Sequence, residues 1–392
     1  MKRPFLFGVP GVVAFALMLI AATYGLVRLA FGLLLPDIQS ELGFSADVAG
    51  AISAGGSALY VVGALVGFFA AGAPRVLVAT AAGSAALGAA GMALATDAVV
   101  FAVAAAVGSA GAGFASPGVV GVLRSHPGTS SRPAFQDVAN SGTGPGLVAA
   151  GLLALALLPG WRIVWAVAAV VAVVAGVGVL LTSRSHVPPR GRPAVPPGRW
   201  FLAHARPIAA ALALGAGSAA VWTFGRIALV DAGMDAASSV VAWIALGAGG
   251  AVVAFTSSRT VGWGPRRVWV LTGVLAAVAT VSLPLVAESF LAALGACVVF
   301  GWSYTAATGA LIGWTGDIDA ERPAAGTALL FVVLVAGQGA GAAALGGLVE
   351  PWGYAGVFAV ASVVLLVATL GAVSPRGRES RALPPVAARG LR

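Results

Sequence analysis

Long apolar runs, separated by short polar or charged segments, make up most of this 392-residue chain. An α-helix needs about 20 apolar residues to cross the hydrocarbon core of a bilayer, and most of the runs reach or exceed that length. We therefore expect one transmembrane helix in each of twelve runs, near residues 9–35, 48–71, 76–96, 98–122, 134–158, 161–181, 207–230, 238–258, 268–287, 289–312, 324–348 and 354–373. The pattern predicts an all-α membrane protein with twelve transmembrane helices.

Composition excludes a water-soluble protein. Hydrophobic residues make up 59% of the chain and charged residues only 9%, against roughly 25% charged in soluble domains. The 55 glycines favour close helix packing, because small residues let helix backbones approach each other in lipid.

The basic residues lie between the apolar runs and at both ends instead of forming one patch, so the net charge of +9 does not indicate a nucleic-acid partner. If the N-terminus is cytoplasmic, the outside loops hold only Arg162 as a basic residue. This skew matches the positive-inside rule. It predicts a multi-pass protein of a bacterial-type plasma (inner) membrane, with both termini cytoplasmic.

The two halves of the sequence echo each other at an offset of about 190 residues. Arg-Pro-Ala occurs at 132–134 and at 322–324, and an aromatic residue precedes an arginine by four positions in the pairs Tyr24 with Arg28 and Trp222 with Arg226. We expect two pseudo-symmetric six-helix bundles. The predicted parts are an N-terminal bundle at 1–181, a basic cytoplasmic linker at 182–206, a C-terminal bundle at 207–373 and a basic cytoplasmic tail at 374–392.

Several local motifs resemble those of the major facilitator superfamily. Residues 35–45, Leu-Pro-Asp-Ile-Gln-Ser-Glu-Leu-Gly-Phe-Ser, look like the family's exit from its first helix. The family's cytoplasmic loop signature is degenerate, since Gly67 and Arg75 remain but Ala71 replaces the acid. In the second half Arg259 and Arg266 stand in the corresponding loop. The resemblance implies alternating access between two bundles and a gating role for these four residues.

The fifth run carries Gly142-x-Gly144-Pro145-Gly146, which is similar to the Gly-Pro motif of the family's antiporters. Proline removes a backbone hydrogen bond and glycine removes side-chain bulk, so this helix is expected to bend. Gly144 and Pro145 are therefore candidates for a conformational role. The alternative is a kink where two helices cross closely.

Only two basic residues, Arg28 and Arg226, lie well inside the runs, at corresponding depths in the two halves. Charges within a bilayer are costly and indicate function. We expect the two guanidinium groups to face each other across a central cavity and to clamp an anion, and superfamily carriers of anionic metabolites have arginines on these helices. The alternative is that each arginine reaches outward or pairs with Asp37 or Asp231.

Five further residues are candidates for binding the solute. Tyr24 and Trp222 lie one helical turn before the arginines, Tyr304 interrupts the tenth run, and the amides of Asn140 and Gln338 interrupt the fifth and eleventh. Buried amides need partners, which are either the solute or other helices. Tyr60 we interpret as a packing or interfacial residue.

Coupling to a proton needs a titratable group near the cavity. Asp137, about one turn into the fifth run, is the candidate proton carrier, while capping or an ion pair with Arg132 is the alternative. The sequence holds no metal-ligand cluster, phosphate-binding loop or nucleophile triad, so we expect neither a metal, nor a cofactor, nor an enzyme.

These features together favour a secondary active transporter of a small organic anion. The competing hypothesis is an efflux antiporter for neutral or cationic amphiphilic compounds, in which the arginines are structural.

Overall fold

The computed structural model describes residues 9–126, 129, 134–183 and 195–371, and across these ranges the regular elements are all helices. The first half contains α1 (Val9–Ile20), the π-helix η2 (Ala21–Leu29), α2 (Ala30–Leu42), α3 (Ala46–Phe69), α4 (Pro74–Leu94), α5 (Ala98–Ser125), α6 (Ala134–Asn140), α7 (Thr143–Leu157) and α8 (Trp161–Thr182). The second half contains α9 (Gly198–Ala203), α10 (Ala205–Asp231), α11 (Ala236–Thr260), the 3-10 turn η3 (Val261–Trp263), α12 (Pro265–Leu285), α13 (Phe290–Ile318) and α14 (Pro323–Gly371). Residues 184–194 of the predicted linker, and all of the predicted tail, fall outside the described residues.

Within the described chain, 11 helical stretches are long and apolar enough to cross a membrane. One of them, α14, is 49 residues long and loses its helical conformation at Gly353, where φ is 64°. At 1.5 Å per residue such a helix would be about 73 Å long, more than twice the bilayer core. A break at Gly353 gives two spans, which is compatible with the twelve that the sequence predicts.

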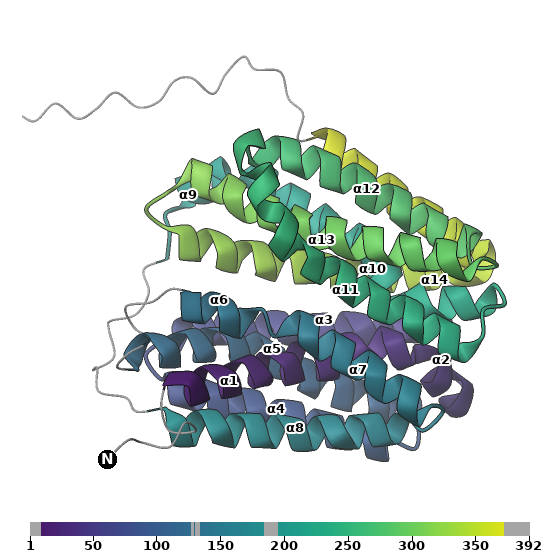
Figure 1. The fold of residues 1–392 in the computed structure, drawn as a ribbon, viewed down its shortest axis with the longest axis horizontal. Coiled ribbons are helices and arrows are strands. Elements are labelled where there is room, and N and C mark those ends of the chain that lie inside the picture. Colours follow the sequence, from purple (N-terminus) through teal and green to yellow (C-terminus); the bar gives the residue numbers. More distant parts are fainter. Residues whose placement is uncertain (1–8, 127–128, 130–133, 184–194, 372–392) are drawn as a thin grey trace, which may run out of the picture.

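The helices form two layers (Figure 1), one built from the first half of the chain and one from the second. In the first layer α4 packs between α5 and α8, and α3 packs on α5; in the second, α14 packs on α10 and α12. The most extensive contacts between the layers are those of α3 with α14, α7 with α11, and α2 with α10.

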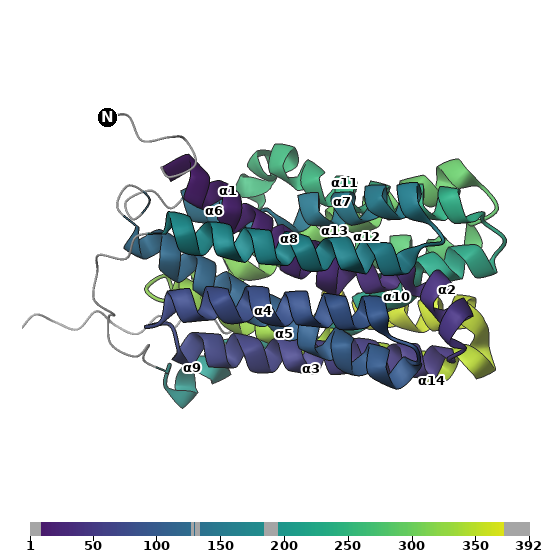
Figure 2. The ribbon, with the colours of Figure 1, turned by 90° about the horizontal axis from the view of Figure 1, so that it is seen from below.

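We call the end of the molecule that carries α9 the linker end, and the end with the turns at 43–45, 158–160 and 351–353 the far end; Figures 1 and 2 show the helices running between them. Close contacts between the layers gather toward the far end. There Gly50 of α3 lies against Ala342 of α14, and Gly346 lies against Ala46. A Cβ atom added at Gly50 would overlap the Ala342 carbonyl, so glycine is what allows these backbones to meet.

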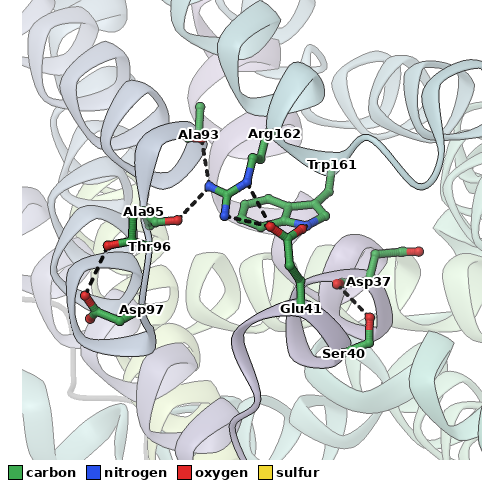
Figure 3. A network of polar contacts seen from close by, with 9 residues as sticks. All are labelled: Asp37, Ser40, Glu41, Ala93, Ala95, Thr96, Asp97, Trp161 and Arg162. Atoms are coloured by element: carbon green, nitrogen blue, oxygen red, sulfur yellow. Dashed lines mark hydrogen bonds and ion pairs between the residues drawn. The ribbon is translucent and has the colours of Figure 1, made fainter.

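A polar network ties the far end of the first layer together (Figure 3). Arg162 donates to Glu41 (2.8 Å) and to the carbonyls of Ala93 (3.0 Å) and Ala95 (2.6 Å), and Trp161 Nε1 donates to the same carboxylate (2.6 Å). The guanidinium thereby satisfies carbonyls at the end of α4 that lack helical partners.

Candidate functional site

The first transmembrane segment changes its helical register where it passes the centre of the molecule. Residues Ala21–Leu29 form a π-helix between α1 and α2, and both Tyr24 and Arg28 lie in it. π-helical stretches are rare and are frequently found at functional sites. The sequence pattern predicted a continuous helix here and gave no sign of the change.

Arg28 joins the two layers at mid-depth. Its Nη2 donates to Gln338 Oε1 of α14 (2.8 Å), and its guanidinium carbon lies 5.0 Å from the centre of the Tyr60 ring of α3. Gln338 in turn donates through Nε2 to the Tyr304 hydroxyl of α13 (3.0 Å). Three of the residues predicted from the sequence, Arg28, Gln338 and Tyr304, thus form one hydrogen-bonded chain.

The charge of Arg28 has no acidic partner in the described part of the chain. The ion pairs found there join Glu41 to Arg162, Asp37 to Arg226 and Asp319 to Arg322. Arg28 instead contacts a neutral amide and an aromatic face. A guanidinium has five N–H donors, so this half-buried group keeps donors for a further ligand.

Aromatic side chains surround Arg28 on both layers. Tyr24 and Tyr60 share a hydrogen bond between their hydroxyls (3.1 Å), and their rings meet edge to face at 5.8 Å. On the other layer Trp222 meets Tyr304 edge to face at 5.3 Å. Tyr24 and Trp222, predicted as neighbours of the arginines, therefore lie on opposite sides of the same region.

Arg226 has a different environment. Its side chain, from α10, is 0% exposed, and its guanidinium donates to Ser239 Oγ (3.0 Å) and the Leu33 carbonyl (2.7 Å) while forming an ion pair with Asp37. Leu33 and Asp37 belong to α2, so the contacts join the two layers toward the far end. The two arginines do not face each other across a cavity in this structure. Arg226 instead pairs with Asp37, which is the alternative derived from the sequence.

A small cavity lies next to Arg28. Helices of both layers line it, and its polar side chains are Arg28, Ser53, Ser57, Ser109, Thr223, Gln338 and Trp222. It holds about 40 Å³, enough for a few water molecules. Ser53 and Thr223 share a hydrogen bond across the layers (2.9 Å), which places this cavity between the two halves.

The glycines of the Gly-Pro motif flank a break between α6 and α7. A Cβ atom at Gly142 would overlap the Leu17 carbonyl, and one at Gly146 would overlap Ala21, so both glycines pack directly on the first transmembrane segment. Gly144 has open space around it, and Pro145 is exposed beside an apolar groove. This geometry is that of a close helix crossing.

Two predicted residues lie away from Arg28. Asn140 is exposed at the end of α6 and accepts a long hydrogen bond from Ser116 (3.5 Å). Asp137 lies in the same short helix, but its side chain is outside the described part of the structure, as is all of Arg132. Its role in proton coupling stays a prediction.

Comparison with known proteins gives a match to the family model described as Major Facilitator Superfamily, over residues 14–325. The chain belongs to the Major Facilitator Superfamily. None of the curated proteins compared with the sequence matches it. The family and the fold together identify a multi-pass membrane transporter.

Solved structures of superfamily transporters share the fold at low sequence identity. A point mutant of the nucleoside transporter NupG has a TM-score of 0.76 at 14% identity, covering 93% of this chain and 100% of its own. A bacterial homolog of the human lysosomal transporter Spinster, inward-facing and unoccupied, has a TM-score of 0.70 at 15% identity, covering 92% and 94%. A POT family transporter in complex with a thioalcohol-conjugated peptide has a TM-score of 0.73 at 13% identity, with the same coverage.

Three of the residues taken from the superfamily's loop signature, Gly67, Arg75 and Arg266, have contacts to other helices of their own layer. Gly67 packs on the Pro117 ring of α5, and Arg75 donates to the Ser183 carbonyl (2.8 Å) and hydroxyl (2.6 Å) at the end of α8. In the second layer Arg266 lies 5.2 Å from the Trp314 ring, and Arg259 is exposed at the end of α11. Their gating role remains a prediction.

Sequence reasoning did not place Ser53 and Thr223 in the site, and it interpreted Tyr60 as a packing or interfacial residue; Tyr60 is buried in the core and also contacts Arg28. Tyr60 lies near the middle of its helix, a depth at which interfacial aromatic belts do not form, and that depth was the available signal. Ser53 and Thr223 carried none, because hydroxyl groups in membrane helices commonly bond to their own backbone.

Proposed function

We propose that this protein is a secondary transporter of small organic anions and that Arg28 binds the anionic group. The observation that carries this proposal is the position of the Arg28 guanidinium. This charged group lies between the two layers, and its contacts among the described residues are with neutral side chains. The similar solved structures include a nucleoside transporter and a peptide-bound transporter, so the fold alone does not select a solute.

Electrostatics favours an anion over a cation. A guanidinium stays charged at any working pH and matches carboxylate geometry with paired donors. Because an unbalanced charge at this depth is costly, an anion that arrives at Arg28 removes part of that cost, whereas a cation would add to it. Arg226 does not take part in the proposed binding, since Asp37 already neutralises it.

The aromatic neighbours suggest where the body of the solute lies. Tyr24 and Tyr60 on one layer, and Trp222 and Tyr304 on the other, offer ring faces and hydroxyls around Arg28. Such a site suits a small acid with an apolar or aromatic part. Since Arg28 and Gln338 come from different layers, the solute would contact both halves, as alternating access requires.

Uptake of labelled benzoate into proteoliposomes tests the proposal. Arg28→Ala should reduce uptake by about tenfold or more, because hydrogen bonds to a charged group contribute about 1.5–3 kcal/mol. Arg28→Lys should retain part of the activity, since it keeps the charge but loses the paired donors.

Arg124→Ala, at an exposed arginine in the last turn of α5, is the matched control and should transport normally. Benzoate uptake that is equal in Arg28→Ala and wild type would overturn the proposal. If Arg28→Ala vesicles instead exchange a neutral or cationic amphiphile at the wild-type rate, the efflux hypothesis replaces it.

A further inference from the structure

Two buried hydroxyl groups near Arg28 have no hydrogen-bond partner among the described residues. Ser57 of α3 is 4% exposed and Ser109 of α5 is 7% exposed. Neither hydroxyl makes a hydrogen bond to any residue that the structure describes, whereas Ser218 and Ser303 bond to carbonyls of their own helices. Neither oxygen is fully enclosed by protein atoms, so both hydroxyls are open to a water molecule or a ligand.

Both serines line the small cavity that also contains Arg28. The neighbouring glycines leave room for them: a Cβ atom at Gly56 would come within 2.8 Å of Ser109 Oγ, and one at Gly339 within 2.8 Å of Ser57 Cβ. The other two hydroxyls in the cavity, Ser53 and Thr223, already bond to each other (2.9 Å). Among the described residues that line the cavity, the donors left for a ligand are therefore the hydroxyls of Ser57 and Ser109, the guanidinium and the indole N–H of Trp222, which also has no partner.

We propose that Ser57, Ser109 and Arg28 form a binding site for a small monovalent anion. No carboxylate lines the cavity among the described residues, so the electrostatic field there comes from Arg28, and two hydroxyls can both donate to a compact acceptor. The volume of the cavity, about 40 Å³, suits one small ion or one carboxylate group. The ligand is either a halide ion or the carboxylate group of the transported solute, and in the latter case the inference rests on the proposed function.

Thermal unfolding of the purified full-length protein in detergent tests the site. Chloride or acetate is titrated against gluconate at constant ionic strength, because a ligand that binds only the folded state stabilises it by RT ln(1 + [L]/Kd) and so raises Tm as its concentration rises above Kd. The wild type should be stabilised by both anions. Ser57→Ala and Ser109→Ala should each weaken the apparent affinity about tenfold, and the double variant more.

Ser303→Ala is the matched control, since Ser303 is 0% exposed but donates to the Phe300 carbonyl (3.1 Å). It should keep the wild-type anion affinity even if its baseline Tm falls. Anion affinities that are equal in the wild type and the Ser57→Ala/Ser109→Ala double variant would overturn the inference, as would a wild type that responds to neither anion.

The outcomes separate this inference from the proposed function. Loss of benzoate uptake in Arg28→Ala, with unchanged anion affinity in the serine variants, supports the transport proposal and sinks the serine site. Normal benzoate uptake in Arg28→Ala, with anion affinity lost in the serine variants, supports the serine site and contradicts the transport proposal. Chloride that competes with benzoate assigns the site to the carboxylate of the solute, and chloride that accelerates benzoate uptake assigns it to a separate halide ion.

Discussion

Arg28 and Arg226 occupy corresponding positions in the two halves of the sequence, yet their charges have different partners. Arg226 forms a buried ion pair with Asp37, while Arg28 bonds to Gln338. The sequence identified both residues and named Asp37 as one alternative partner. It could not choose, because Asp37 and Arg226 are 189 residues apart and their meeting depends on how the two layers pack.

The ion pair of Asp37 and Arg226 leads to a prediction for stability. Asp37→Ala leaves a fully buried guanidinium without its counter-charge, and such uncompensated charges lower the free energy of unfolding by about 3–5 kcal/mol. The double variant Asp37→Leu/Arg226→Met should be far less destabilised, because it removes both charges and keeps apolar volume. Thermal unfolding in detergent measures both effects.

The exposed ion pair of Glu41 and Arg162 at the far end provides a comparison. Glu41 and Arg162 are 50% and 35% exposed in their side chains, and exposed pairs contribute little, typically about 0–1 kcal/mol. Glu41→Gln should therefore lower Tm much less than Asp37→Ala. Equal losses for Asp37→Ala and the double variant would contradict the view that the unpaired charge causes the damage.

At the scale of elements, the sequence predicted where helices lie better than it predicted their interruptions. Long apolar runs indicated the spans, of which the described chain has 11 candidates. The Gly-Pro motif indicated a bend, and the structure has a break between α6 and α7. The π-helix Ala21–Leu29 was missed. Its residues resemble those of an ordinary helix, and its first residue, Ala21, packs against Gly142 and Gly146, a contact that no local pattern indicates.

Two glycines of the motif make a matched test of that packing. Gly146→Ala places a methyl group against Ala21, and overpacking of this kind typically lowers stability by about 1–3 kcal/mol. Gly144→Ala meets no atom within 4 Å and should be neutral or slightly stabilising, since alanine is the better helix former. Unfolding temperatures and benzoate uptake should fall together for Gly146→Ala.

If Gly144→Ala instead abolishes uptake while leaving Tm unchanged, the motif acts as a hinge and not as a packed crossing. That result would favour the conformational role predicted from the superfamily's antiporters.

For the whole molecule, the sequence predicted the fold class more fully than the relation between the layers. Hydropathy and the repeated motifs depend on each segment alone, and they anticipated an all-helical membrane protein of the Major Facilitator Superfamily. The contacts of α3 with α14 depend on Gly50 and Gly346 meeting a distant helix. No local pattern distinguishes these glycines from the many others in the chain.

The gathering of inter-layer contacts toward the far end indicates a conformation closed at that end. Transport by alternating access requires these contacts to separate in each cycle. Gly346 and Asp47 offer a way to prevent this, because a Cβ atom at Gly346 would lie 3.3 Å from the Asp47 Cα. It would also lie 2.8 Å from the Ala46 carbonyl oxygen, so the helices must shift slightly and uptake by the reduced variant is the reference for the test. Cysteines at the two positions would be close enough for a disulfide, which would hold α3 on α14.

In a background with Cys297 replaced by serine, the Asp47→Cys/Gly346→Cys variant should lose benzoate uptake under oxidising conditions and regain it on reduction. A Gly91→Cys/Ala104→Cys variant is the control, since a Cβ atom at Gly91 would lie 2.9 Å from the Ala104 Cβ, between α4 and α5 of a single layer. Cross-linking there joins helices that move together and should leave uptake intact. Mass spectrometry verifies that the far-end cysteines have cross-linked. Full transport by the oxidised far-end variant would show that α3 and α14 stay in contact throughout the cycle. The layers would then have to rotate about that contact instead of separating there.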